Sequence, residues 1–282
     1  MTRTDLRFEH GGVALAYDDL GTGGAPALVL IHGGSGSRES WTEVAAALVP
    51  RHRILAVDLA GHGDSDRAPG SYSVPDQGAR IAALCEQVAA GDTVLIGHSF
   101  GALVAAYVAA VRPDVVRAAV LGDPPMYIMD PAVWPSTMFG MFFPLLRAAM
   151  EEAHRSDDPV AGLRSWIQSL PVYAERLGPD GVERFARSWA KCDPAVLGSV
   201  DDPAVDKAVW ADHDPDTPIA CPVLVVRADP GIMPAFYAEH EERFRRAAPG
   251  ARFVLAEGCS HSIHDEQPGW LAEQVETFLA SR

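Results

Sequence analysis

Short apolar runs that alternate with helical segments constrain the fold of this chain more than any other feature of its sequence. The runs are continuous, which is typical of strands buried on both faces of a parallel sheet. Those before residue 123 are Ala27–Ile31, RILAVD up to Asp58, TVLIGH and RAAVLG. The segments ESWTEVAAALVP, Asp76 to Ala90 and FGALVAAYVAAV have helical spacing. The pattern therefore predicts βαβ units.

The alternation stops near residue 124 and resumes near residue 216. The residues between are rich in helix formers, with scattered prolines and aromatics. The pattern returns with PVLVVR, a predicted helix over Pro234–Ala248, the strand ARFVLA and a last helix over Gly269–Ala280. With an N-terminal hairpin of LRFEH and VALAYDDLG, this predicts a mostly parallel eight-stranded sheet flanked by helices. Residues 1–123 and 216–282 form its core, and residues 124–215 form a helical cap over the carboxyl ends of its strands, where α/β sheets place their sites.

The composition limits the partners that such a chain binds. A formal net charge of −15 argues against a nucleic-acid partner, because binding the phosphate backbone needs a clustered basic surface. No apolar run approaches the ~18 residues of a membrane span, and the N-terminus lacks the apolar core of a signal peptide. We therefore expect a cytoplasmic protein that acts on a small molecule and binds neither nucleic acid nor membrane. The sequence leaves a homodimer open.

The motif Gly97–Gly101, GHSFG, follows an apolar strand and opens a helix of small residues. A serine on so tight a strand-to-helix turn is held in a strained backbone conformation, and glycines two residues away on each side avoid collisions across the turn. The turn points the hydroxyl out of the sheet, next to a helix N-terminus that favours a developing negative charge. Ser99 is therefore the predicted nucleophile.

Two further segments supply what a serine nucleophile needs. The glycine-rich loop His32–Ser37 follows the first buried strand, and its backbone can donate hydrogen bonds to an oxyanion. We assign the two donors to the N–H groups of Gly34 and Phe100, with Ser35 as the neighbouring option. A general base is also required, and His261 directly follows the turn after the last strand. His261 is the predicted base.

Together these segments resemble the α/β-hydrolase superfamily over the whole chain. The resemblance rests on the HGG loop with Trp41 a few residues on, the segment Asp58–Ser65, the GHSFG elbow and the late histidine. It implies an α/β-hydrolase fold and a Ser-His-Asp triad, and it implies neither metal nor other cofactor. Asp58, His62 and Asp64 could suggest a metal site, but in this family that loop is structural. The four cysteines also lack the spacing of zinc ligands.

The triad acid has two candidates. Members of the family usually carry it about three residues past a glycine that ends the strand before the last. Here that glycine is replaced by Ala228, and Asp229 comes early. A minority take the acid from the end of the strand before the cap, where this chain has Asp123. Both aspartates precede a proline, and an Asp–Pro pair is also common in ordinary turns. We favour Asp123 slightly and keep Asp229 open.

The start of the cap predicts the substrate. Five of the seven methionines fall between Met126 and Met150, among several aromatic residues. They predict a soft apolar lining for a bulky substrate. We name Ser35, Met126, Trp134 and Phe139 as substrate-binding residues. The predicted function is cleavage of an ester or lactone through an acyl-enzyme.

Two other functions stay open. Carbon–carbon hydrolases of diketones in this family generally carry an Asn and an Arg near the oxyanion loop. Arg38 is present there, but the chain has no asparagine. A non-catalytic member of the fold that binds a ligand is the other alternative. Dehalogenases and epoxide hydrolases of the fold use an Asp nucleophile, which Ser99 excludes.

Overall fold

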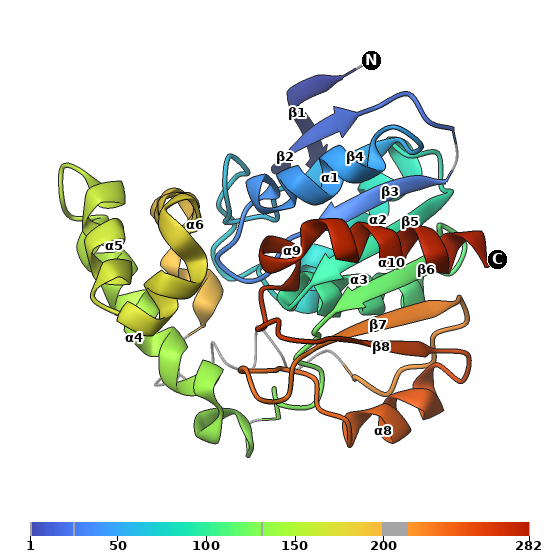
Figure 1. Ribbon diagram of the computed structural model, residues 1–282. Coiled ribbons are helices and arrows are strands. Elements are labelled where there is room, and N and C mark those ends of the chain that lie inside the picture. Colours follow the sequence, from blue (N-terminus) through green and yellow to red (C-terminus); the bar gives the residue numbers. More distant parts are fainter. Residues whose placement is uncertain (1, 25, 131, 199–213, 282) are drawn as a thin grey trace.

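The computed structural model describes residues 2–24, 26–130, 132–198 and 214–281. Within them, eight strands form one sheet in the order β1-β2-β4-β3-β5-β6-β7-β8 (Figure 1). Strands β3 to β8 run parallel to one another, and β2 is antiparallel to both of its neighbours, β1 and β4. The strands are β1 Arg3–His10, β2 Val13–Leu20, β3 Ala27–Ile31, β4 Ile54–Val57, β5 Thr93–His98, β6 Val116–Gly122, β7 Val223–Ala228 and β8 Arg252–Ala256. The predicted mostly parallel eight-stranded sheet is confirmed.

Helices cover both faces of the sheet (Figure 1). The α-helices of the described residues are α1 Thr42–Leu48, α2 Val74–Gln87, α3 Phe100–Val111, α4 Met138–Ala153, α5 Pro159–Gln168, α6 Pro171–Lys191, α8 His240–Ala247, α9 Ile263–Glu266 and α10 Pro268–Ala280. Short 3₁₀ helices lie at η1 Arg38–Trp41, η2 Trp134–Ser136 and η3 Pro194–Leu197. Helices α2, α3 and α8 pack on one face, and α1, α9 and α10 pack on the other.

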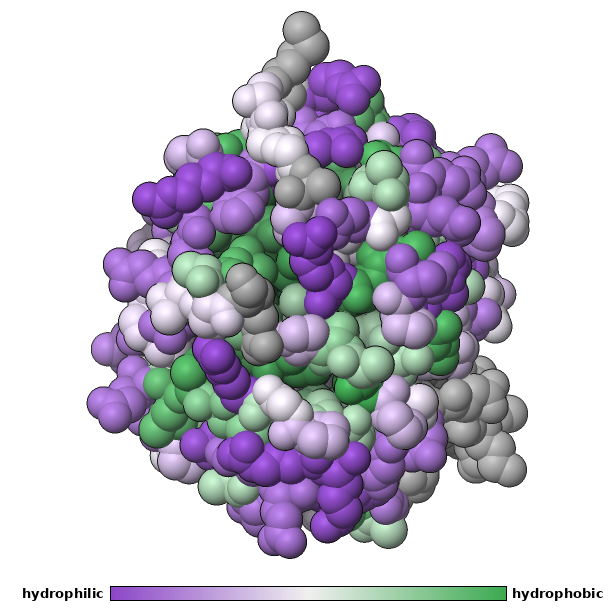
Figure 2. Space-filling model, turned by 90° about the vertical axis from the view of Figure 1, so that its right-hand side faces the viewer, coloured by the Kyte–Doolittle hydropathy of each residue, from purple (hydrophilic) through white to green (hydrophobic). Residues whose placement is uncertain are grey.

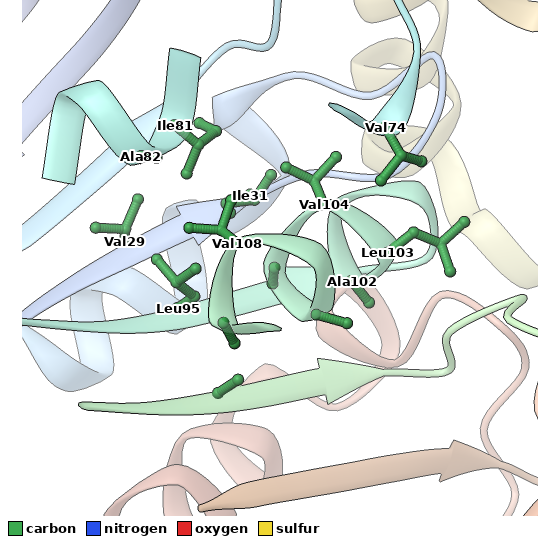
Figure 3. Close-up of a cluster of buried hydrophobic side chains, with 14 of the residues drawn as sticks. Val29, Ile31, Val74, Ile81, Ala82, Leu95, Ala102, Leu103, Val104 and Val108 are labelled. Atoms are coloured by element: carbon green, nitrogen blue, oxygen red, sulfur yellow. The ribbon is translucent and has the colours of Figure 1, made fainter. Parts of the chain in front are cut away.

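The hydrophobic core consists of two clusters, one on each face of the sheet. Side chains alternate along β3, so Val29 and Ile31 join the cluster under α2 and α3, while Leu28 and Leu30 join the one under α1 and α10. Figure 3 shows the first cluster, where side chains of α2 and α3 meet those of β3 and β5. Full burial of one such side chain contributes about 1.5–3 kcal/mol. The central strands are therefore the rigid base on which the loops at their carboxyl ends rest.

The helices between β6 and β7 lie beside the carboxyl ends of the parallel strands, at the left of Figure 1. Helices α4, α5 and α6 have a hydrophobic cluster of their own, which includes Leu146, Leu163 and Trp189. The predicted cap, residues 124–215, contains these helices, and its residues 199–213 lie outside the described part of the chain. Figure 2 shows the face on the right-hand side of Figure 1, away from helices α4 to α6. Apolar residues in the middle of this face are surrounded by hydrophilic ones.

One predicted helix is shorter than expected. The helix predicted over Pro234–Ala248 begins only at His240. The backbone N–H groups of Ala235 and Phe236 donate to the carboxylate of Asp123 instead. The chain before α8 is therefore folded around a buried charge, which local helical propensity does not reveal.

Candidate active site

Ser99 lies on the sharp turn between β5 and α3, at the carboxyl end of a central strand. Its backbone has φ 51° and ψ −118°, which is a strained conformation for a residue with a Cβ atom. A Cβ on Gly97 would lie 2.2 Å from the carbonyl oxygen of Gly101, and one on Gly101 would lie 2.3 Å from that of Ile31. Both positions therefore need glycine, and the turn holds Ser99 at the N-terminus of α3.

His261 follows β8 and is held by a buried carboxylate. Its Nδ1 donates to Oδ2 of Asp123 over 2.7 Å. Asp123 directly follows β6, is fully buried, and has a positive φ of 41°. The backbone N–H groups of Ala228, Ala235 and Phe236 also donate to its carboxylate, over 3.3, 2.7 and 3.0 Å. These contacts compensate the desolvation of the charge and fix its position.

Asp229, the other candidate acid, forms no hydrogen bond with His261 among the described residues. Its carboxylate accepts the N–H groups of Gly231 and Gly258, both over 2.9 Å. These hydrogen bonds lower the pKa of the Asp229 carboxyl. The backbone N–H of Asp229 donates to the carbonyl of Cys259. Asp229 therefore stabilises the turns after β7 and β8 and does not orient the imidazole.

Ser99, His261, Gly34 and Phe100 line one cavity. The rest of its described wall is apolar and consists of Pro125, Met129, Trp134, Phe139, Phe143, Val196 and Leu197. The ring of Phe139 lies 4.7 Å from the imidazole of His261. The free volume is only about 20 Å³, which is room for about one water molecule. A larger ligand can enter only if cap side chains move.

These features agree with what comparison with known proteins finds. The profile of the alpha/beta hydrolase family matches residues 28–274. The chain belongs to this family.

Individual α/β-hydrolases are similar over nearly the whole chain. The lipase LipV of Mycobacterium tuberculosis is 39% identical over 293 aligned positions, which cover 96% of this chain and 99% of the lipase. An esterase of the same organism is 37% identical over 269 positions, which cover 92% of this chain and 85% of the esterase. The crystal structure of the enol-lactonase from Burkholderia xenovorans has a TM-score of 0.76 at 22% identity and covers 98% of this chain and 100% of that one. At that identity the lactonase shows the fold alone.

The glycine-rich loop His32–Ser37 corrects one prediction. Ser35 was expected to bind substrate or to offer a second oxyanion donor. Its N–H donates to Nε2 of His62 over 3.2 Å, and its hydroxyl donates to the carbonyl of Gly34 over 2.6 Å. The side chain is buried and does not line the cavity. Ser35 therefore stabilises the loop, while Gly34 faces the cavity.

Two buried histidines join the glycine-rich loop to the loop after β4. His32 Nδ1 donates to the carbonyl of Gly33, and His32 Nε2 accepts from the N–H of Leu59. His62 Nδ1 donates to the carbonyl of Ala60. Burial lowers the pKa of His32 to about 4 and that of His62 to about 3. Both rings are therefore neutral at pH 7 and serve as donor–acceptor bridges.

The cap residues divide into those that line the cavity and those that do not. Trp134 and Phe139 line it. Met126, which was also predicted to bind substrate, does not line it. It is buried in the core cluster under α2 and α3. Met129 and Phe143 line the cavity and were not named. Both fall in the Met- and aromatic-rich segment that pointed to the lining.

His98 and His264 also lie at the site, and sequence reasoning gave neither a role there. The His98 ring lies 4.6 Å from that of His261 and 4.3 Å from that of His264. Its Nε2 lies 2.7 Å from the carbonyl oxygen of His261, which makes it the donor. Burial, together with the neighbouring imidazoles, lowers the pKa of His98 well below its usual range. His98 therefore supports the backbone of His261 as a neutral ring.

The described residues contain neither a metal cluster nor a membrane span. In the part of the chain that the structure covers, no group of three or more His, Cys, Asp or Glu could hold a metal ion. Asp58 instead accepts from the side chain of Arg38 and from the backbone N–H of Asp64. No helix among the described residues is long and apolar enough to cross a bilayer.

Proposed function

We propose that the chain is a serine hydrolase that cleaves an ester or lactone of a bulky, largely apolar small molecule through an acyl-enzyme on Ser99. One observation carries the proposal. His261 donates from Nδ1 to the buried carboxylate of Asp123 over 2.7 Å and lines the same cavity as Ser99. In that tautomer Nε2 of the imidazole has the lone pair that accepts the serine proton.

The proposed reaction proceeds in two steps. Oγ of Ser99 attacks the carbonyl carbon while His261 accepts its proton, and the N–H groups of Gly34 and Phe100 bind the oxyanion. The intermediate collapses, the imidazolium gives the proton to the leaving alkoxide, and an ester links the acyl group to Ser99. Water then attacks this ester with His261 again as base, which releases the acid and regenerates the serine. Asp123 holds the imidazole and stabilises its charged form throughout.

The wall of the cavity supports an apolar substrate. Apart from His261, none of its described residues carries a charged side chain, so a carboxylate on the substrate would be desolvated there without a cation. The stacked rings of Trp134 and Phe139, 6.5 Å apart, and the nearby ring of Phe143 offer a wide apolar surface. The small free volume implies that a bulky substrate displaces these side chains as it binds.

The alternative of carbon–carbon cleavage finds no support in the position of Arg38. Its guanidinium is 7% exposed and pairs with Asp58 and also with Asp5, Asp18 and Asp64. It does not line the cavity that contains Ser99. We therefore do not assign it to substrate, and the ester or lactone remains the proposal.

A turnover screen tests the proposal. p-Nitrophenyl esters of increasing acyl length, aromatic and aliphatic lactones and a diketone are compared for the wild type and Ser99→Ala. We expect kcat/KM to rise as the acyl chain grows beyond acetate. Ser99→Ala should lower kcat by at least about 10³-fold with an unchanged melting temperature. Turnover of the diketone alone would favour carbon–carbon cleavage. A steady fall of kcat/KM from acetate onwards would contradict the apolar lining.

A further inference from the structure

The segment after β8 that contains His261 is bound to helix α6. Nε and Nη2 of Arg176, on α6, donate to the two carboxylate oxygens of Glu266, each over 3.0 Å. Nη2 also donates to the carbonyl of Gly258 over 2.9 Å. His261 lies between Gly258 and Glu266 in the sequence. One guanidinium group therefore holds this segment both before and after the proposed base.

The Glu266 carboxylate extends this contact to the residue next to His261. It accepts from the backbone N–H of Ser260 over 3.0 Å and also from the Ser260 hydroxyl. Ser260 is buried. Burial alone would raise the pKa of the Glu266 carboxyl, but the hydrogen bonds from Arg176 and Ser260 lower that pKa below its usual range. The carboxylate is therefore charged at pH 7 and joins Arg176 to the turn that carries the imidazole.

Helix α6 also contacts the helix that lines the cavity of Ser99. Phe143, on α4, lines that cavity. The ring of its neighbour Phe142 lies 6.0 Å from the ring of Tyr173, on α6. Tyr173 and Arg176 are three positions apart, so they lie on the same side of the helix. The wall of the cavity and the segment that carries His261 are thus connected through α4 and α6.

Other contacts attach α6 to the core independently of Arg176. Arg184 pairs with Asp265 over 2.6 Å, and the hydroxyl of Ser188 lies 2.9 Å from that of Ser37. The Arg176 side chain is 34% exposed, and a partly exposed ion pair adds little to global stability. Loss of its guanidinium group should therefore loosen the segment around His261 and leave α6 in place.

We propose that Arg176 is a positioning residue for the hydrolysis proposed at Ser99. It holds Glu266, and through that carboxylate it fixes the turn that places His261 in the site. This inference rests on the proposed function, because the ion pair is assigned to the alignment of the base. Displacement of a reacting group by about 1 Å can cost about 100-fold in rate. A contact that adds little to stability can therefore control catalysis.

Steady-state kinetics on the best ester of the screen tests this with a matched control. Arg164, on α5, pairs with Glu183 over 2.7 Å at a similar exposure, 39%, and that pair includes no residue of the segment 258–266. Arg176→Gln should lower kcat by about tenfold or more and change KM by less than about threefold, because the apolar wall stays intact. Arg164→Gln should stay within about twofold in both, with a similarly small change in melting temperature.

A conservative variant and a spectroscopic signal add readouts that a purely structural role would not move. Arg176→Lys keeps the charge without the two-pronged geometry, so it should lose less in kcat than Arg176→Gln. The Nδ1 proton of His261, bound to Asp123, should give a downfield proton NMR resonance that Asp123→Asn removes. We expect this resonance to be sharp in the wild type and in Arg164→Gln, and broadened by faster exchange with water in Arg176→Gln.

The NMR signal needs no turnover, so it separates this inference from the hydrolase proposal. An unchanged resonance in Arg176→Gln, or a loss of kcat no larger than that of Arg164→Gln, would overturn the positioning role. A wild type that hydrolyses no ester or lactone would instead contradict the proposed function. The resonance would then still decide whether Arg176 holds the imidazole of His261 in place.

Discussion

The neighbouring parallel strands β6 and β7 both end at an Asp–Pro pair, but the two aspartates have different environments. Asp123, after β6, is fully buried and holds His261. Asp229, after β7, accepts from the backbone N–H groups of Gly231 and Gly258 in the surrounding turns. The same dipeptide thus has two roles, and the role is set by which distant segments converge on the carboxylate. The loop before α8 and the turn after β8 converge on Asp123.

The largest effect is expected when Asp123 is neutralised. Asp123→Asn keeps the volume but orients the wrong imidazole tautomer, so kcat should fall by about 10³–10⁴ while KM changes little. Steady-state kinetics on the best ester of the screen measures this, with the melting temperature as the control for folding. A kcat within about tenfold of the wild type would show that Asp123 is not the triad acid.

The pH dependence of the melting temperature should also distinguish the two strand ends. The buried His98 lies beside the β6 end, and its folded pKa is well below the usual 6.5. The unfolded chain then binds more protons, so the stability that the neutral ring provides is complete above about pH 6.5 and is lost as the pH falls below it. We expect the melting temperature to drop by at least about 2 °C between pH 6.5 and 5, and by less in His98→Gln. Equal drops in melting temperature for the wild type and His98→Gln would contradict the lowered pKa assigned to His98.

Asp229 contributes in the same direction but over a lower pH window. Its pKa is lowered by the N–H groups of Gly258 and Gly231, so its contribution is present above about pH 4 and lost only at lower pH. Asp229→Asn should therefore leave the change in melting temperature between pH 6.5 and 5 the same as in the wild type.

The smallest expected effect is that of Asp229→Asn on catalysis. The side chain contacts turns and not the imidazole, so kcat should fall by about tenfold or less. The same ester assay measures it beside Asp123→Asn. A loss as large as that of Asp123→Asn would mean that the turn after β7 controls the position of His261 as strongly as the buried carboxylate does.

The sequence predicted the sheet well because each strand has a recognisable local pattern. The bounds of β3, β5 and α3 agree with the predicted segments, since continuous apolar runs and the glycines around Ser99 are local features. The acid could not be settled locally. The atoms that distinguish Asp123 from Asp229 belong to residues more than a hundred positions away from Asp123, among them Ala228 and Phe236.

The sequence predicted which types of residue line the cavity, but not which individual residues do so. The Met- and aromatic-rich segment after β6 indicated an apolar wall, and Trp134 and Phe139 lie in it. Which methionine faces the cavity depends on how the chain leaves the sheet. Met126 packs into the core and Met129 reaches the wall.

Covalent labelling with a fluorophosphonate, followed by peptide mass spectrometry, tests the proposed nucleophile most directly. The reagent forms a bond only with an activated serine held beside a base and oxyanion donors. We expect one label per chain in the wild type, on the peptide that contains Ser99, no label in Ser99→Ala, and slow labelling in Asp123→Asn. A label on another residue, or undiminished labelling of Ser99→Ala, would contradict this expectation.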